Sequence, residues 1–211
     1  MVAHEFNNIL TTIVSYAQLA KKNPKMVGKA LDHAASGGTR AACICGALLG
    51  AARGGTDVRR RVVLDELVSE TLDAMARRPE RDCIEMSIDI PSDLDVVTRP
   101  LELQQVLLNL LINARNSVMA SEGSRNIEVS ASKKQDEVVI SISDNGMGIA
   151  EDRIGKVFQP FYSTRAGEET ANRAHGLGLA FCKRIVGELG GDINVSSVLG
   201  KGATFTIHIP V

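Results

Sequence analysis

Residues 137–149, with the sequence EVVISISDNGMGI, join an alternating strand directly to an acidic residue and a glycine-rich turn. Because the side chains of a strand alternate between two faces, Val138, Ile140 and Ile142 share one face, and Asp144 falls on that face as well. A carboxylate aimed at an apolar interior is costly unless a hydrogen-bonding group meets it there. The pattern therefore predicts either a strand that ends in an Asx-type turn or a buried carboxylate that binds a ligand.

Two glycines follow this carboxylate at once, since Gly146 and Gly148 flank a single methionine in the segment DNGMGI. Glycine lets the backbone adopt positive φ and approach a ligand closely. Taken alone, the segment fits a simple turn as well as it fits a ligand site. Other features of the chain have to decide between the two.

Size, charge and cysteine spacing limit the classes of protein to consider. A chain of 211 residues with 44% hydrophobic residues can build one large core or two smaller ones. Its net charge of -1 argues against nucleic-acid binding, which needs clustered surplus Lys and Arg. No apolar run reaches the roughly 18 residues that span a bilayer. Cysteines stand at positions 43, 45, 83 and 182 without CxxC spacing, which predicts reduced thiols in a cytoplasmic protein without membrane contact.

The N-terminal part of the chain reads as two helices joined by a tight turn. Residues 4–22 place apolar side chains at helical spacing, and Asn23 and Pro24 then break the helix. A second helix is expected from about residue 24 to residue 53, with small and aliphatic side chains on a seven-residue repeat. A single hairpin cannot bury both apolar faces, so we expect a homodimer in which two hairpins form a four-helix bundle.

Beyond residue 54 the pattern changes to mixed α and β, which predicts a hairpin at 1–54, a linker at 55–61 and a second domain at 62–211. Strands are expected at 62–64, 83–90, 127–132, 137–143, 192–197 and 203–209. Helices are expected at 65–77 with Asp65 as N-cap, at 99–119 opened by Thr98 and Pro100, and at 176–189. The chain is thus α+β, and its second domain is an α/β sandwich of helices on a mixed or antiparallel sheet.

A row of amide side chains marks the helix expected at 99–119, because Gln105, Asn109, Asn113 and Asn116 fall in one stripe of an otherwise apolar segment. Such a row sometimes only ties down neighbouring backbone. Alternatively, amide oxygens are hard, uncharged ligands that could hold a Mg²⁺ already bound to nucleotide phosphates.

A second pair of glycines, Gly176 and Gly178, opens a predicted helix in the segment HGLGLA. Bare backbone amides at a helix N-terminus form an anion site, which the helix macrodipole favours further. One GxG is weak evidence. Together with the first glycine pair behind an inward Asp, it favours the ligand-binding interpretation.

These motifs, taken together, resemble the catalytic portion of a sensor histidine kinase of two-component signalling. HEFNN resembles the phosphoacceptor box of that family, and QQVLLNLLINARNS resembles its Asn box. DNGMGI, FQPFYSTR, HGLGLA and GKGATF resemble the first glycine box, the Phe box, the second glycine box and the last box, in the order of the family. The resemblance covers nearly the whole chain. It implies a phosphotransfer hairpin followed by an ATP-binding domain of the GHKL (Bergerat) type.

The resemblance also implies roles for single residues in binding ATP and Mg²⁺. Asp144 would accept the adenine amino group, Asn113 would bind Mg²⁺, and Asn109 and Asn116 would belong to the same site. Arg165 could reach the terminal phosphate. Further nucleotide contacts are implied for Gly146, Gly148, Gly176, Leu177, Gly178 and Thr204.

On the hairpin, the resemblance implies that His4 is the phosphate-accepting nucleophile. A neutral imidazole nitrogen is abundant near neutral pH. Glu5 can act as general base or orient the imidazole. Asn8 lies one turn further along the helix and could position a water that hydrolyses the aspartyl phosphate of a partner. That partner would be the receiver domain of a response regulator. The transfer from ATP to His4 could occur within one chain (in cis) or between the two chains of the dimer (in trans).

Departures from the family pattern are few, and two other functions compete with the kinase. Ile9 stands where Pro is frequent, His175 stands where Thr or Ser is common, and Ala203 stands where Thr or Ser is frequent. At the last of these positions Thr204 or a water could replace the missing hydroxyl. The alternatives are a histidine phosphotransferase or pseudokinase adaptor without ATP turnover, and a GHKL ATPase of the chaperone or topoisomerase type.

Overall fold

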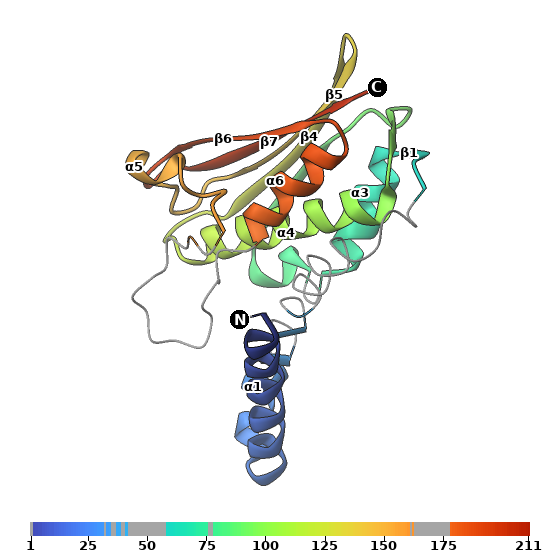
Figure 1. The fold of residues 1–211 in the computed structure, drawn as a ribbon. Helices are drawn as coiled ribbons and strands as arrows, with labels where there is room; N and C mark the ends of the chain where they lie inside the picture. Colours follow the sequence, from blue (N-terminus) through green and yellow to red (C-terminus); the bar gives the residue numbers. More distant parts are fainter. Residues whose placement is uncertain are drawn as a thin grey trace.

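A computed structural model describes residues 2–31, 33–34, 37–38, 41, 58–75, 78–160, 162 and 178–211, with the backbone alone in residues 2–7. Figure 1 shows a helical N-terminal part and a larger part in which helices lie against a sheet. The predicted boundary after residue 54 lies outside the described residues. No described helix is long and apolar enough to cross a bilayer.

The N-terminal part begins with helix α1 (Val2–Lys22), which ends where the sequence predicts. The Asn23 side chain accepts a hydrogen bond from the backbone of Lys25 at 3.1 Å and caps the short 3-10 helix η1 (Pro24–Met26). Helical residues follow at 27–31, 33–34, 37–38 and 41. The predicted continuation of this helix to residue 53 lies outside the described residues.

Side chains of the returning helical segment pack against α1. The rings of Tyr16 and His33 stack with their centroids 3.7 Å apart. A methyl group added at Gly37 would come within 2.7 Å of the Ile13 side chain, so the two helical segments touch closely at this point. Ile9 is buried in the same contact region. The described residues thus form the predicted helical hairpin.

The second part is built on a five-stranded sheet in the order β2-β4-β5-β7-β6. The strands are β2 (Glu85–Asp89), β4 (Asn126–Lys134), β5 (Glu137–Asp144), β6 (Asp192–Val198) and β7 (Gly202–Pro210). Strand β2 runs parallel to β4, and all other neighbours are antiparallel, so the sheet is mixed. A separate pair of strands, β1 (Arg60–Val63) and β3 (Asp95–Thr98), is antiparallel.

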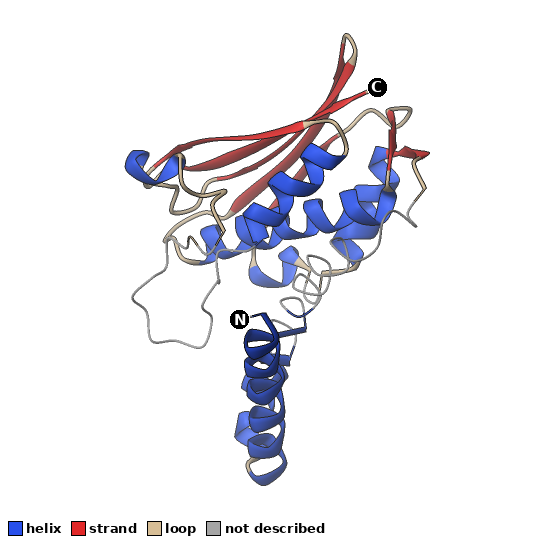
Figure 2. Cartoon of the chain, in the orientation of Figure 1, coloured by secondary structure: helices blue, strands red, loops and turns tan. Residues whose placement is uncertain are grey.

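One face of the five-stranded sheet carries the main helices, as Figure 2 shows: α3 (Leu64–Asp73), α4 (Pro100–Met119) and α6 (Gly178–Glu188). The inward side chains of β5 and β7 are aliphatic or aromatic and pack with α4 into one core. On the other face, hydroxyl groups pair across the strands, with Ser143 and Thr204 2.9 Å apart. This alternation confirms the predicted α/β sandwich.

Several predicted boundaries need correction. Helix α3 ends at Asp73 rather than near residue 77, and its N-cap is Val63, without a side-chain hydrogen bond. Asp65 lies inside the first turn of α3. Its negative charge there interacts favourably with the positive end of the helix dipole, but its side chain does not cap the helix. Strand β1 begins at Arg60, within the segment predicted as linker.

Strand β3 was not predicted, and it changes the start of α4. Thr98 is the last residue of β3 and pairs with Arg60, so the N-cap of α4 is Arg99 rather than Thr98. The Thr98 hydroxyl is buried without a hydrogen-bond partner in the described part of the chain. Pro100 does occupy the first turn, as expected. A short helix, α5 (Glu151–Ile154), was also not predicted.

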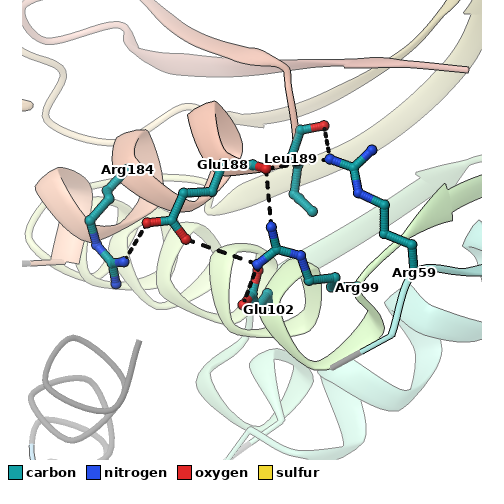
Figure 3. Close-up of polar contacts among 6 residues, drawn as sticks. All are labelled: Arg59, Arg99, Glu102, Arg184, Glu188 and Leu189. Carbon is teal, nitrogen blue, oxygen red and sulfur yellow. Dashed lines mark hydrogen bonds and ion pairs between the residues drawn. The ribbon is translucent and has the colours of Figure 1, made fainter. Parts of the chain in front are cut away.

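Two arginines bind carbonyl groups at the end of α6 and just after it (Figure 3). Arg59, in the segment before β1, donates to the Leu189 carbonyl oxygen at 3.0 Å. Arg99, before α4, donates to the Glu188 carbonyl oxygen at 3.1 Å. Because the last carbonyls of a helix have no partners within it, these contacts fix the C-terminal end of α6 to the start of the domain.

Candidate nucleotide-binding site

Asp144 ends strand β5 and points into the protein, where it is 7% exposed. Ile127 of β4 and Ala203 of β7 are its partners on the neighbouring strands. The Ser117 hydroxyl donates to its Oδ1 atom at 2.8 Å, and the Gly146 backbone amide donates to the same oxygen at 2.9 Å. The inward position predicted from the alternating pattern is therefore confirmed.

Burial raises the pKa of Asp144 above its ordinary value. Hydrogen bonds from Ser117, from the backbone of Gly146 and from the backbone of Ala203 act in the opposite direction. No basic side chain of the described residues is among the causes of this shift. A buried carboxyl with a perturbed pKa and no cationic partner is a candidate for ligand binding.

The turn after Asp144 needs glycine because of its own packing. A side chain at Gly146 would overlap the Ser117 hydroxyl and the Ser117 backbone. Gly148 has a φ of +64°, and a side chain there would overlap the Val198 carbonyl oxygen. The turn therefore lies tightly between α4 and the β6–β7 connection, which holds Asp144 in place.

Asn145, inside this turn, fixes it to the start of β4. Its Oδ1 atom accepts a hydrogen bond from the Asn126 backbone at 2.8 Å, and its Nδ2 atom donates to the Ser124 carbonyl oxygen at 3.0 Å. Sequence reasoning did not single out Asn145. The common turn sequence DNG was the available signal, since Asn side chains often bond to nearby backbone in turns.

Helix α4 places its predicted amide row beside this turn. Asn109, Asn113 and Asn116 are half-buried, whereas Gln105 is exposed. A side chain at Gly178, the first residue of α6, would lie 3.6 Å from the Asn109 Oδ1 atom. The structure thus brings the Asn-rich stripe together with the start of the helix that the second glycine pair opens.

Ser117 was missed as a site residue, although it belongs to the same helix. It lies four residues after Asn113 and so extends the polar stripe by one helical turn. Its role became visible only through its contact with Asp144, which is distant in sequence. A serine that continues a polar stripe on an otherwise apolar helix was the signal that could have identified it.

Thr204 lies away from this site. Its hydroxyl pairs with Ser143 on the opposite face of the sheet, while the neighbouring Ala203 faces Asp144. Thr204 therefore does not replace the hydroxyl that position 203 lacks. Arg165, Gly176 and Leu177 lie outside the described residues, as do the side chains of His4 and Glu5 in α1; Asn8 is exposed on α1.

The residues around Asp144 fit a purine nucleotide and its metal ion in their chemistry. The buried carboxylate can accept from an amino group, and the Asn109 and Asn113 amide oxygens can bind a hard cation. No cluster of three or more His, Cys, Asp or Glu in the described ranges could hold a metal ion. Uncharged amide ligands suit a cation that arrives already bound to phosphates.

An α/β sandwich with this buried carboxylate, glycine turn and amide-lined helix defines the chain as a nucleotide-binding protein of the GHKL fold class. Residues 98–211 match the model of the histidine kinase-, DNA gyrase B- and HSP90-like ATPase family, and the chain belongs to this family.

Relatives and solved structures agree with this assignment. The chain is 33% identical over 225 residues to the signal transduction histidine-protein kinase AtoS of Escherichia coli K12, covering 100% of this chain and 34% of the relative. It is 30% identical over 214 residues to the sensor histidine kinase ZraS of Salmonella typhimurium, covering 100% of this chain and 44% of the relative. The chain thus spans less than half the length of these relatives.

The catalytic domain of histidine kinase ThkA has a TM-score of 0.60 and 27% identity, covering 72% of this chain and 95% of that domain. The Acinetobacter baumannii histidine kinase AdeS has a TM-score of 0.71 and 22% identity, covering 98% of this chain and 97% of that chain. At this identity, the likeness to AdeS shows the shared fold alone. It extends the agreement to the N-terminal helices.

Proposed function

We propose that this chain is the catalytic portion of a protein-histidine kinase, which binds ATP beside Asp144 and transfers its terminal phosphoryl group to His4. The observation that carries the proposal is the buried Asp144 carboxylate at the point where α4 and the glycine turn meet. The similarity to histidine kinases along the whole chain supports it.

In this proposal the nucleotide is bound at both ends. Asp144 accepts a hydrogen bond from the adenine amino group, while Gly146 and Gly148 allow the tight turn that frames the base and holds this carboxylate in place. Asn113, supported by Asn109 and Asn116, holds Mg²⁺. This ion, when bound, neutralises charge on the phosphates. Contacts to the phosphates come from Arg165, Gly176, Leu177 and Gly178.

Phosphoryl transfer then depends on the hairpin. A neutral nitrogen of the His4 imidazole attacks the γ-phosphorus, the bond from this phosphorus to the bridging oxygen breaks, and ADP leaves. Glu5 orients the imidazole or takes up its proton. Because such transfer depends mainly on alignment and charge neutralisation, the protein has to position His4 rather than activate it strongly.

The second partner is the receiver domain of a response regulator, whose Asp takes the phosphoryl group from His4. Asn8, exposed one turn beyond His4, positions a water for hydrolysis of the resulting aspartyl phosphate. We also propose a homodimer through the hairpin. One hairpin leaves apolar side chains exposed, among them Leu10, Val14, Leu19, Val27 and Leu31, each between 42% and 65%.

Incubation with γ-labelled ATP and Mg²⁺ tests the proposal. We expect acid-labile label on the protein, its loss in His4→Ala, and its transfer to one response regulator in a profile of purified receiver domains. No label in the wild type would favour the adaptor without ATP turnover. Steady ATP hydrolysis without labelled protein would favour an ATPase of the chaperone or topoisomerase type.

A further inference from the structure

We infer that Ser117 is a positioning residue of the base pocket, which orients the Asp144 carboxylate and makes the pocket select a purine with an amino group over one with an oxo group. The inference rests on the proposed function, since it concerns the base of the nucleotide that Asp144 accepts. It assigns a role to a residue outside the predicted site.

The geometry fixes the carboxylate in one orientation. The terminal torsion of an Asp side chain is broad and roughly two-fold, so an unrestrained carboxylate can turn. Here the Ser117 hydroxyl and the Gly146 amide both donate to Oδ1, at 2.8 Å and 2.9 Å. The Ala203 backbone also hydrogen-bonds to this carboxylate, so it is restrained from α4, from the glycine turn and from β7. A carboxylate has about four lone-pair sites, so it can still accept a hydrogen bond from a ligand.

Ser117 is itself held on two sides. Its carbonyl oxygen accepts from the Met147 amide at 3.4 Å, while its hydroxyl contacts Asp144. Gly146 leaves no side chain between them, because any Cβ there would overlap Ser117. The last turns of α4 and the glycine turn therefore form one unit, and the hydroxyl cannot move away from the carboxylate without disturbing both.

The chemistry of the hydroxyl sets the selectivity. A serine hydroxyl has one hydrogen, and Ser117 gives it to Asp144, so its oxygen retains only acceptor capacity. The Ser117 hydrogen bond lowers the pKa of Asp144 against the larger effect of burial, and so favours the ionised carboxylate, which also only accepts. An amino group of the base finds acceptors at this point. An oxo group would face acceptors and would leave polar atoms unpaired, which a buried site penalises.

The neighbouring strand does not supply this hydroxyl. Position 203 pairs with Asp144 across β5 and β7 and carries alanine, which has no polar side-chain atom. The hydroxyl on Asp144 therefore comes from α4, on the other side of the carboxylate. This relation provides a rescue: serine at position 203 can return a hydroxyl to the same carboxylate from β7.

The test compares ATP and inosine triphosphate, in which an oxo group replaces the amino group, by calorimetric titration of the wild type and variants. Ser117→Ala removes the hydroxyl. Ser143→Ala is the matched control, because it also removes one serine hydroxyl paired with a side chain, but on the opposite sheet face. Ser117→Cys keeps the side-chain size with a weak donor and serves if Ser117→Ala does not fold.

We expect Ser117→Ala to bind ATP about tenfold more weakly, the change that 1.4 kcal/mol produces. The ratio of the affinity for ATP to the affinity for inosine triphosphate should also fall in Ser117→Ala. The double variant Ser117→Ala with Ala203→Ser should recover part of the ATP affinity and part of this ratio. Ser143→Ala should match the wild type. A carbon-detected titration should show a higher pKa for Asp144 in Ser117→Ala, because the Ser117 hydrogen bond lowers it.

The outcomes separate this inference from the proposed function. The role of Ser117 is overturned if the wild type prefers ATP and the Ser117→Ala and Ser117→Cys variants keep the same preference. That result leaves the kinase proposal intact. A wild type that binds neither nucleotide overturns both. A wild type that binds both equally overturns the selectivity while leaving nucleotide binding in place.

Discussion

Arg99 donates a hydrogen bond to the Glu188 carbonyl oxygen at 3.1 Å and so joins the start of α4 to the end of α6. The same guanidinium forms hydrogen bonds to both carboxylate oxygens of Glu102, at 2.8 Å and 2.7 Å. Its positive charge lies at the negative end of the α6 dipole. Because the other end of α6 lies beside Asn109, this contact supports the geometry of the candidate site from a distance.

Replacing Arg99 by alanine should destabilise the protein by about 1.5–3 kcal/mol, the cost of hydrogen bonds to charged groups in a partly buried place. Its side chain is only 19% exposed. Urea unfolding measures the change. Arg61→Ala is the control, because the Arg61 side chain is 72% exposed in its pair with Asp95 and should cost under about 1 kcal/mol. Equal losses in both variants would contradict the prediction.

Another ion pair joins Asp82 to Arg115 of α4. The Arg115 Nε atom donates to Asp82 Oδ2 at 2.7 Å, and the Asp82 side chain is 5% exposed. Arg115→Ala removes a charged hydrogen-bond partner of this buried carboxylate, so we expect a loss of about 1.5–3 kcal/mol in the free energy of unfolding. Unfolding in urea, monitored by circular dichroism, gives the value.

The matched control for Arg115→Ala is Arg78→Ala, because Arg78 pairs with Asp73 at the surface, with side chains 62% and 59% exposed. An exposed pair contributes about 0–1 kcal/mol. The double variant Asp82→Asn with Arg115→Met should lose less than Arg115→Ala, since it leaves no buried charge. A double variant as unstable as the single one would show that packing, rather than charge, sets the cost.

The sequence predicted the elements that local patterns determine. The alternation from Val138 to Ile142 placed Asp144 on the core face, and the structure confirms this. The polar stripe on α4 and the strands β4 and β5 were recognised for the same reason, because each depends on spacing within one segment.

Features that depend on contacts between distant segments were missed. Strand β3 exists because it pairs with β1, whose residues lie 32 to 38 positions away in the paired register. The partnership of Ser117 with Asp144 joins a helix to a turn 27 residues later. The register of β7 against β5 determines on which face of the sheet Thr204 lies. This register could not be predicted from the sequence of either strand alone. Such pairings are set by tertiary packing rather than by local propensity.

The buried Asp144 predicts an unusual dependence of stability on pH. Burial raises its pKa in the folded protein, so the folded state binds more protons than the unfolded state between the two pKa values. The Asp144 contribution to stability is therefore present below the unfolded pKa and is lost as pH rises through the folded pKa. At neutral pH, which lies above the unfolded pKa, the raised pKa lowers stability unless a ligand satisfies the carboxyl group.

Asp144→Asn should remove this pH dependence. Without ligand, the variant should be at least as stable as the wild type at neutral pH. ATP should no longer raise its melting temperature. Thermal unfolding between mildly acidic and neutral pH, with and without ATP, measures both effects. Asp192→Asn, at an exposed site, should behave like the wild type in both. A variant that still gains stability from ATP would contradict the role of Asp144 in binding.

Gly146→Ala should destabilise the protein by about 1–3 kcal/mol, the usual cost of overpacking, because the added methyl group overlaps the Ser117 backbone. Gly187→Ala is a control of opposite sign: an alanine there meets no atom within 4 Å, and it lies in α6. That substitution should stabilise by about 0.5–1 kcal/mol, since glycine costs conformational entropy in a helix. Chemical unfolding of both variants tests whether the turn tolerates a side chain. If Gly146→Ala were as stable as the wild type, α4 and the turn would have to separate without cost, and Ser117 could not hold Asp144 rigidly.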